Sequence, residues 1–276
     1  MSVLPRFDFV YLGDNARAPY GNKSFDLIHE YTLEGIEFLF NQGCELVILA
    51  CNTASARALK NIQVLHLPKN RPDRRVLGVI RPSVEALAGL PCGALPGVTK
   101  PTLATGTVAV VGTESTIASD SYGLELRKLA PNLNLIQQAC PLWASLVEAG
   151  ELQGAGTEYF LRKSLEPIFA REEKIQKLLL GCTHYPLLLP TLRKLVPAGV
   201  EIIDQSEIVA ERFAGWLKRH SDFESALGRN ALREFATTDD AEWFSKRGQK
   251  LLGMPFEAVK ARLGAAKMGI SSLSCV

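Results

Sequence analysis

Short apolar segments, separated by longer helical patterns, are the feature that most constrains how this chain can fold. Each segment is rich in Val, Ile and Leu and ends near Gly, Pro, Asp or Cys, as strands do. The segments are continuously apolar rather than alternating, which predicts parallel strands covered on both faces. They occupy residues 9–14, 45–51, 76–82, 107–113, 133–140, 177–182 and 200–204.

Helical patterns fill the intervals between these predicted strands. Residues 24–43 begin with a Ser cap, and residues 115–131 show a similar pattern. Residues 233–254 predict one further strand and one helix. Residues 89–106 are rich in Gly and Pro and predict a loop that connects two lobes. Together these patterns predict an α/β protein with doubly wound parallel sheets.

One pattern occurs twice in the chain. Residues 46–60 are LVILACNTASARALK, and residues 178–194 are LLLGCTHYPLLLPTLRK. Both run from an apolar strand through a small residue to Cys, then to polar residues, then to a helix. The second copy lies about half the chain length after the first, as expected for two related lobes. We therefore predict two pseudo-symmetric lobes with the active site between them.

The two cysteines of this repeat are the candidate reactive groups. Cys51 and Cys182 stand at the carboxyl ends of predicted strands, where doubly wound sheets bind their ligands. A helix N-terminus after each would favour a thiolate or a bound carboxylate. If the lobes face one another, one thiolate could remove an α-proton while the opposite thiol protonates the other face. Polar side chains beside them are Asn52, Thr53, Thr183 and His184.

Two other interpretations of these cysteines remain open. Either thiol alone is explained by a small buried side chain at a strand end. A Cys-His hydrolase needs one nucleophile and one orienting group, but it leaves the second cysteine loop unexplained. The chain carries no P-loop and no G-x-G-x-x-G motif, so no nucleotide or redox cofactor is expected.

The sequence resembles the glutamate racemases of the aspartate/glutamate racemase superfamily. The resemblance follows the family's order over about residues 9–207 and continues in FATTDDAEWF (235–244). The motifs that carry it are YLGDNARAPYGNKS (11–24), LVILACNTASARAL (46–59), GVIRPSVEAL (78–87), VAVVGTESTIASDSY (108–122), ACPLWASLVEAGEL (139–152), LLLGCTHYPLLLPTLRK (178–194) and VEIIDQSE (200–207).

This resemblance implies a racemase that interconverts L- and D-glutamate without cofactor or metal and supplies D-glutamate for peptidoglycan in the bacterial cytoplasm. Cys51 and Cys182 match the family's acid/base pair, His184 matches the helper of the second cysteine, and Glu148 lies near that half of the site. The positions that match substrate-holding residues are Tyr20, Gly21, Asn52, Thr53, Thr113, Thr116 and Thr183. The implied lobes are residues 1–82 with 205–276, and residues 83–204.

Several of these residues have simpler explanations. The PYG segment that contains Tyr20 could be only a turn, Glu148 could be a solvated helix residue, and Thr113 and Thr116 could cap the following helix.

Lys and Arg total 31 against 29 Asp and Glu, a net charge of +2, which excludes a strongly basic nucleic-acid surface over the whole chain. No apolar run approaches the ~20 residues that span a bilayer. We expect a homodimer without nucleic-acid or membrane partners.

The family pattern starts earlier than this sequence does. A strand that ends in Asp-Ser-Gly normally precedes the YLGD motif, and no segment before residues 9–14 corresponds to residues 107–113. We therefore expect one strand of the first lobe to be missing, with the helper of Cys51 and one substrate contact, and expect reduced activity and stability. Two rival hypotheses follow: a racemase for aspartate or another amino acid, and a truncated form that only binds its ligand.

Overall fold

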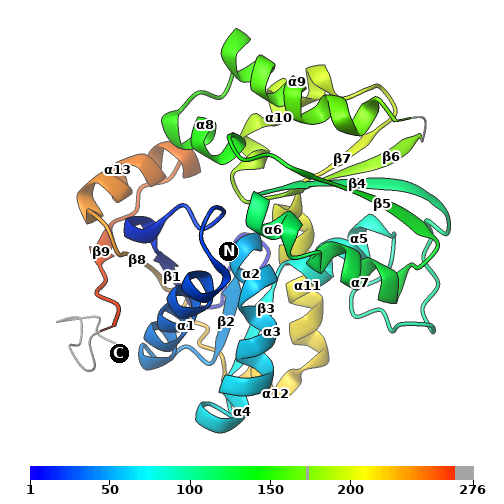
Figure 1. The fold of residues 1–276 in the computed structure, drawn as a ribbon. Helices are drawn as coiled ribbons and strands as arrows, with labels where there is room; N and C mark the ends of the chain where they lie inside the picture. The colour runs from blue at the N-terminus through cyan, green and yellow to red at the C-terminus, as the bar shows by residue number, and fades with distance from the viewer. Residues whose placement is uncertain (172–173, 265–276) are drawn as a thin grey trace.

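The computed structural model describes residues 1–171 and 174–264, and Figure 1 shows its two lobes. Residues 265–276, which complete the predicted first lobe, lie outside the described part. The strands are β1 (Phe9–Gly13), β2 (Leu46–Leu49), β3 (Arg75–Gly78), β4 (Gly106–Gly112), β5 (Leu133–Ala139), β6 (Ile175–Gly181), β7 (Glu201–Ile203), β8 (Arg233–Thr237) and β9 (Ala258–Lys260).

Helices connect these strands along most of the chain. The α-helices are α1 (Phe25–Asn41), α2 (Asn52–Arg57), α3 (Leu59–Asn61), α4 (Leu67–Asn70), α5 (Ile80–Leu87), α6 (Glu114–Ala118), α7 (Ser121–Leu129), α8 (Trp143–Ala149), α9 (Ala155–Phe169), α10 (Leu189–Leu195), α11 (Gln205–Arg219), α12 (Ser221–Ala226) and α13 (Ala241–Leu252). Short 3-10 turns form η1 (Asn15–Arg17) and η3 (Tyr185–Leu188), and η2 (Ile62–His66) is a π-helical turn. Within the described residues, no helix combines the length and apolar character that crossing a bilayer requires.

The second lobe is built on a parallel sheet with the strand order β5-β4-β6-β7. Successive residues of a strand point to opposite faces, and in β4 both sets are apolar. Val108 and Val110 pack with residues of α5 and α7, whereas Ala109 and Val111 pack with residues of α8 and α9. Helices therefore cover both faces of the sheet (Figure 1), which explains why its strands are continuously apolar.

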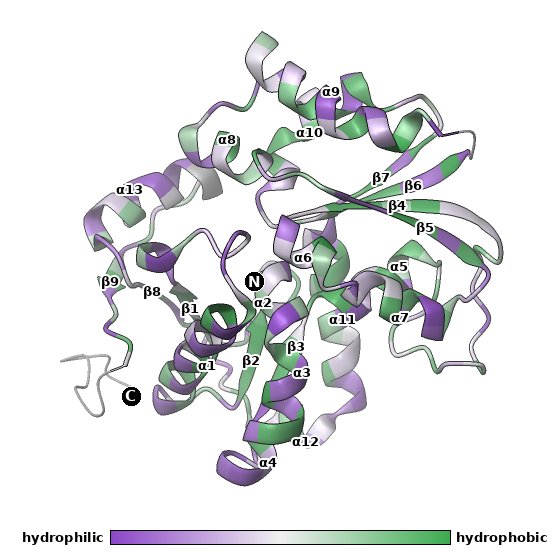
Figure 2. Ribbon diagram, viewed as in Figure 1, coloured by the Kyte–Doolittle hydropathy of each residue, from purple (hydrophilic) through white to green (hydrophobic). Residues whose placement is uncertain are grey.

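The first lobe holds two smaller parallel sheets. One has the order β1-β8-β9 and the other pairs β2 with β3. Its core joins Ile36 and Phe40 of α1 to Val47 and Val76 of the two-stranded sheet. Figure 2 shows apolar residues along β2, while α1 carries apolar and polar residues on different sides. Among the described residues no strand bonds to both β1 and β2, whereas β4 joins β5 to β6 in the second lobe.

The predicted strands are confirmed except at residues 76–82, where the strand ends at Gly78 and α5 begins at Ile80, so the second half of that prediction is wrong. A continuous apolar run does not by itself distinguish a strand from the start of a buried helix. The helix predicted at residues 24–43 is confirmed, and Ser24 accepts a hydrogen bond from the Leu27 N–H. The single helix predicted at residues 115–131 is wrong, because α6 and α7 are separated at Asp120. That residue has a left-handed backbone with φ of 51°, which ends an α-helix. The short strand β9 was not predicted, since three residues carry too little pattern to recognise.

The strands are paired differently in the two lobes, and this predicts a difference in how strongly their backbone amides are protected from hydrogen exchange. We expect peptides that cover Gly106–Gly112 to exchange their amide hydrogens more slowly than peptides that cover Phe9–Gly13 or Leu46–Leu49. The reason is that β4 is hydrogen-bonded to a strand on each side. Among the described strands, β1 and β2 are each paired on one side only. Hydrogen exchange followed by mass spectrometry measures this order, and faster exchange in β4 would contradict it.

Candidate active site

The two repeated cysteines come together at the carboxyl ends of two strands. Cys51 follows β2 by one residue and is the N-cap of α2, while Cys182 follows β6 directly. Burial raises the pKa of the Cys51 thiol, and the nearby Cys182 thiol raises it further. Hydrogen bonds from the backbone N–H groups of Ala54 and Thr53 lower the pKa of this thiol. The two lobes therefore place their thiols close enough to interact electrostatically.

Cys182 has a dedicated chain of polar partners. Its Sγ lies 3.8 Å from Nδ1 of His184, whose Nε2 lies 2.6 Å from Oε1 of Glu148. The contact with Cys182 and the one with Glu148 raise the pKa of His184 to about 10. The pKa of Glu148 is lowered by the same imidazole. A protonated His184 is thus placed to stabilise negative charge on the Cys182 sulfur.

This geometry differs from the helix N-terminus expected after each cysteine. α2 begins directly after Cys51, but the segment after Cys182 continues through Thr183 and His184 into the short turn η3. Thr183 is exposed, and its hydroxyl lies 3.5 Å from Nδ1 of His184. Glu148 is also largely exposed on α8, yet it is paired with His184 rather than solely solvated.

Three threonine hydroxyls meet where the lobes face one another. Thr53 Oγ1 of α2 lies 2.9 Å from Thr113 Oγ1 and 3.2 Å from Thr116 Oγ1, and the latter two are 3.0 Å apart. Thr113 also caps α6, since its Oγ1 accepts the N–H of Thr116 at 3.3 Å. Thr113 is therefore both the N-cap of α6 and a member of the hydroxyl cluster that it forms with Thr53 and Thr116.

The predicted Tyr20–Gly21 loop lies against this cluster. The Tyr20 hydroxyl donates a hydrogen bond to Oδ2 of Asp14, and the backbone oxygen of Gly21 accepts the Ser115 N–H at 3.1 Å. A Cβ atom on residue 21 would lie 2.7 Å from Cβ of Thr113, so only glycine allows this approach. The loop thereby joins the first lobe to the start of α6.

The side chain of Asn52 belongs to a buried polar network and makes its hydrogen bonds there rather than with the thiols. Its Nδ2 donates to Gln205 Oε1 at 2.7 Å, and its Oδ1 accepts the Tyr122 hydroxyl at 2.6 Å. Gln205 Nε2 in turn reaches the Tyr122 hydroxyl at 2.7 Å and Ser83 Oγ at 2.6 Å. These four side chains, which we call the Gln205 network, connect α2, α5, α7 and α11.

Sequence analysis did not predict the Gln205 network. Gln205 stands within the VEIIDQSE motif, at the first position of α11, but nothing local marks it as buried. Its relative exposure is only 7%, and Asn52 is exposed to 2%. A polar side chain this deeply buried requires hydrogen-bond partners, and the network supplies them.

The chain is thus an α/β protein of two parallel-sheet lobes, each with a cysteine at the end of a strand. Residues 10–213 match the model of the Asp/Glu/Hydantoin racemase family, and the chain belongs to that family.

Individual members of the family are similar to this chain over most of its length. The glutamate racemase of Paracoccus denitrificans is 37% identical over 252 residues, which cover 91% of this chain and 90% of that protein. The crystal structure of the RacE1 glutamate racemase of Bacillus anthracis has a TM-score of 0.78 and 30% identity, covering 94% of this chain and 89% of that one. The Francisella tularensis glutamate racemase in complex with D-glutamate has a TM-score of 0.77 and 30% identity, covering 94% and 88%.

Removing one hydroxyl tests the Gln205 network. We expect Tyr122→Phe to lower the free energy of unfolding by about 1–3 kcal/mol, because Asn52 and Gln205 each lose a buried partner. Tyr159→Phe is the matched control, since its ring is exposed on α9, and we expect a change within ~0.5 kcal/mol. Urea unfolding measures both, and equal effects would contradict a structural role for the network.

The charge of His184 can be followed directly by NMR. We expect its imidazole to stay protonated through neutral pH and to titrate near pH 10. Because the folded-state pKa is raised, its contribution to stability is fully present below the unfolded pKa of about 6.5 and is lost as pH rises toward 10. In Glu148→Gln the titration midpoint of His184 should fall, because one of the two contacts that raise its pKa is removed. A wild-type midpoint near 6.5 would contradict this assignment.

Proposed function

We propose that this chain is a glutamate racemase that interconverts L- and D-glutamate without a cofactor. The observation that carries the proposal is the proximity of Cys51 and Cys182, which the two lobes supply from matching strand ends. The similarity over about nine-tenths of the chain to glutamate racemases supports glutamate as the substrate.

The proposed reaction exchanges one proton at Cα and inverts its configuration. One cysteine, as thiolate, takes the α-proton from one face of the substrate, and the other, as thiol, gives its proton to the opposite face. The bond from Cα to hydrogen breaks on one side and forms on the other, so no electrons are transferred to the protein. After turnover the thiol and thiolate have exchanged places, and the reverse reaction restores them.

An amino-acid α-proton is very weakly acidic, so the site must stabilise the negative charge that develops in the transition state. His184, protonated at neutral pH, supplies a positive charge beside Cys182 and is held there by Glu148. We assign the hydroxyls of Thr53, Thr113 and Thr116 to the substrate carboxylates, because they meet between the lobes.

The remaining predicted contacts complete the proposed binding site. Tyr20 and Gly21 bound it on the first lobe and Thr183 on the second, while Asn52 contributes through its backbone and anchors α2 through its side chain. We also propose that the enzyme acts in the cytoplasm as a homodimer and supplies D-glutamate for peptidoglycan.

The first test follows loss of the α-proton signal of L- and D-glutamate in D2O, without added cofactor. We expect exchange with the wild-type chain and a loss of at least ~100-fold in Cys51→Ser and in Cys182→Ser, because each removes one acid/base group. Cys92→Ser is the control, since that thiol donates instead to the backbone oxygen of Arg212.

Other outcomes of the same experiment would overturn parts of the proposal. Exchange of aspartate but not glutamate would contradict the assigned substrate. Undiminished exchange in both serine variants would contradict the two-thiol mechanism. Absence of exchange in a folded wild-type chain that still binds D-glutamate would make it a ligand-binding protein.

A further inference from the structure

Glu148 has a second partner that the catalytic proposal does not use. While its Oε1 contacts His184, its Oε2 lies 3.1 Å from Nη2 of Arg247 on α13. The same nitrogen donates a hydrogen bond to the backbone oxygen of Glu148. The carboxylate is thus held from both sides, with one oxygen for each cation.

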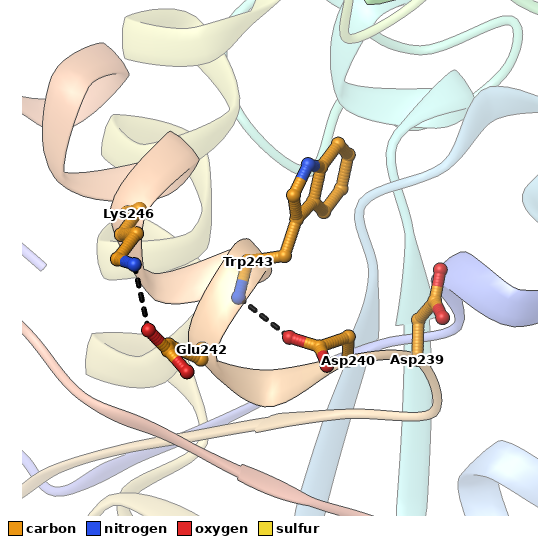
Figure 3. Close-up of a pocket in the computed structure, with 5 residues that line it drawn as sticks. All are labelled: Asp239, Asp240, Glu242, Trp243 and Lys246. Carbon is orange, nitrogen blue, oxygen red and sulfur yellow. Dashed lines mark hydrogen bonds and ion pairs between the residues drawn. The ribbon is translucent and has the colours of Figure 1, made fainter.

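Arg247 is itself fixed in place. Its guanidinium lies over the ring of Trp243, 4.9 Å from the ring centroid, one turn earlier on α13. Asp240 caps this helix by accepting the Trp243 N–H at 2.7 Å, and Glu242 pairs with Lys246 at 2.6 Å. Figure 3 shows both interactions, with the indole of Trp243 pointing away from that ion pair. A stacked arginine loses less freedom on forming its ion pair than an unsupported one would.

The contact joins a helix of the first lobe to a helix of the second lobe. α13 follows β8 in the first lobe, whereas α8 and Glu148 belong to the second lobe, and the two helices lie side by side in Figure 1. The Gln205 network and the threonine cluster link the lobes near α2 and α6. The Arg247–Glu148 contact links them again beside His184, at the helix pair α8 and α13.

We propose, on the basis of the proposed racemase function, that Arg247 is a positioning residue that fixes Glu148 and thereby orients His184 toward Cys182. Arg247 is assigned no contact with the substrate. Docking of α13 on α8 then completes the polar chain of one thiol, so one contact both links the two lobes and orients His184.

The kinetic test compares Arg247→Ala and Arg247→Lys with the wild-type chain on glutamate. We expect kcat to fall about 10- to 100-fold in Arg247→Ala, as for misplaced catalytic groups. KM should change less than about twofold, because no substrate contact is lost. Lysine should recover only part of kcat, since it keeps the charge but not the flat face stacked on Trp243. Arg229→Ala is the control: that arginine also pairs with a glutamate, Glu224, and covers a ring, Phe7.

A double-mutant cycle separates positioning from a general loss of structure. Adding Arg247→Ala to Glu148→Gln should reduce kcat no further, because the group that Arg247 acts through is already altered. Independent, multiplying effects of the two substitutions would overturn the proposal, as would an undiminished kcat in Arg247→Ala.

The midpoint of the His184 pH titration, followed by NMR, is a measurement that does not require enzymatic activity. If Arg247 were only a nearby positive charge, its removal would raise the pKa of His184. If it positions Glu148, its removal lets the carboxylate move away and the midpoint falls instead. A raised or unchanged midpoint in Arg247→Ala would overturn the positioning role even in a chain that does not turn over glutamate. Absence of glutamate exchange in the wild type and in Arg229→Ala, with the His184 midpoint lowered in Arg247→Ala, would instead contradict the proposed racemase function and support the positioning role.

Discussion

Burial of the Gln205 amide among the three polar side chains of Asn52, Ser83 and Tyr122 is the interaction on which the position of the site depends. It ties α2, and therefore Cys51 at its start, to α5, α7 and α11 around the second lobe. A hydrogen-bonded network that is fully buried allows few alternative arrangements, because each broken bond leaves a polar group without water. The position of Cys51 relative to the second lobe is in this way set by contacts away from the thiols themselves.

The two thiols have different surroundings although the sequences of their loops follow a similar pattern. Cys51 interacts with backbone N–H groups at the start of a helix, whereas Cys182 interacts with an imidazole supported by a carboxylate. In the two-thiol reaction that we propose, each thiol acts both as acid and as base, so each environment must tolerate both protonation states. Backbone donors do this with fixed dipoles, and His184 does it with a charge that Glu148 and Arg247 hold in place.

The strands and both cysteine loops could be predicted from sequence because their signals are local. Continuous apolar runs mark β4 and β6, and the repeated small residue, Cys and polar residue mark the strand ends. The break at Asp120 could not be predicted, since it depends on a single left-handed residue inside an otherwise helical pattern. Gln205 and Arg247 were missed for another reason: each acts through a partner far away in the chain, and neither has a distinctive local pattern.

The split sheet of the first lobe also has a mechanical consequence. Cys51 follows the β2–β3 pair, while the Tyr20–Gly21 loop follows β1, which belongs to the sheet with β8 and β9. No backbone ladder between described strands couples the two, so a small shift of one sheet need not carry the other with it. In the binding site that we propose, the wall formed by the Tyr20–Gly21 loop is therefore not tied by pairing between described strands to the strand that leads to Cys51.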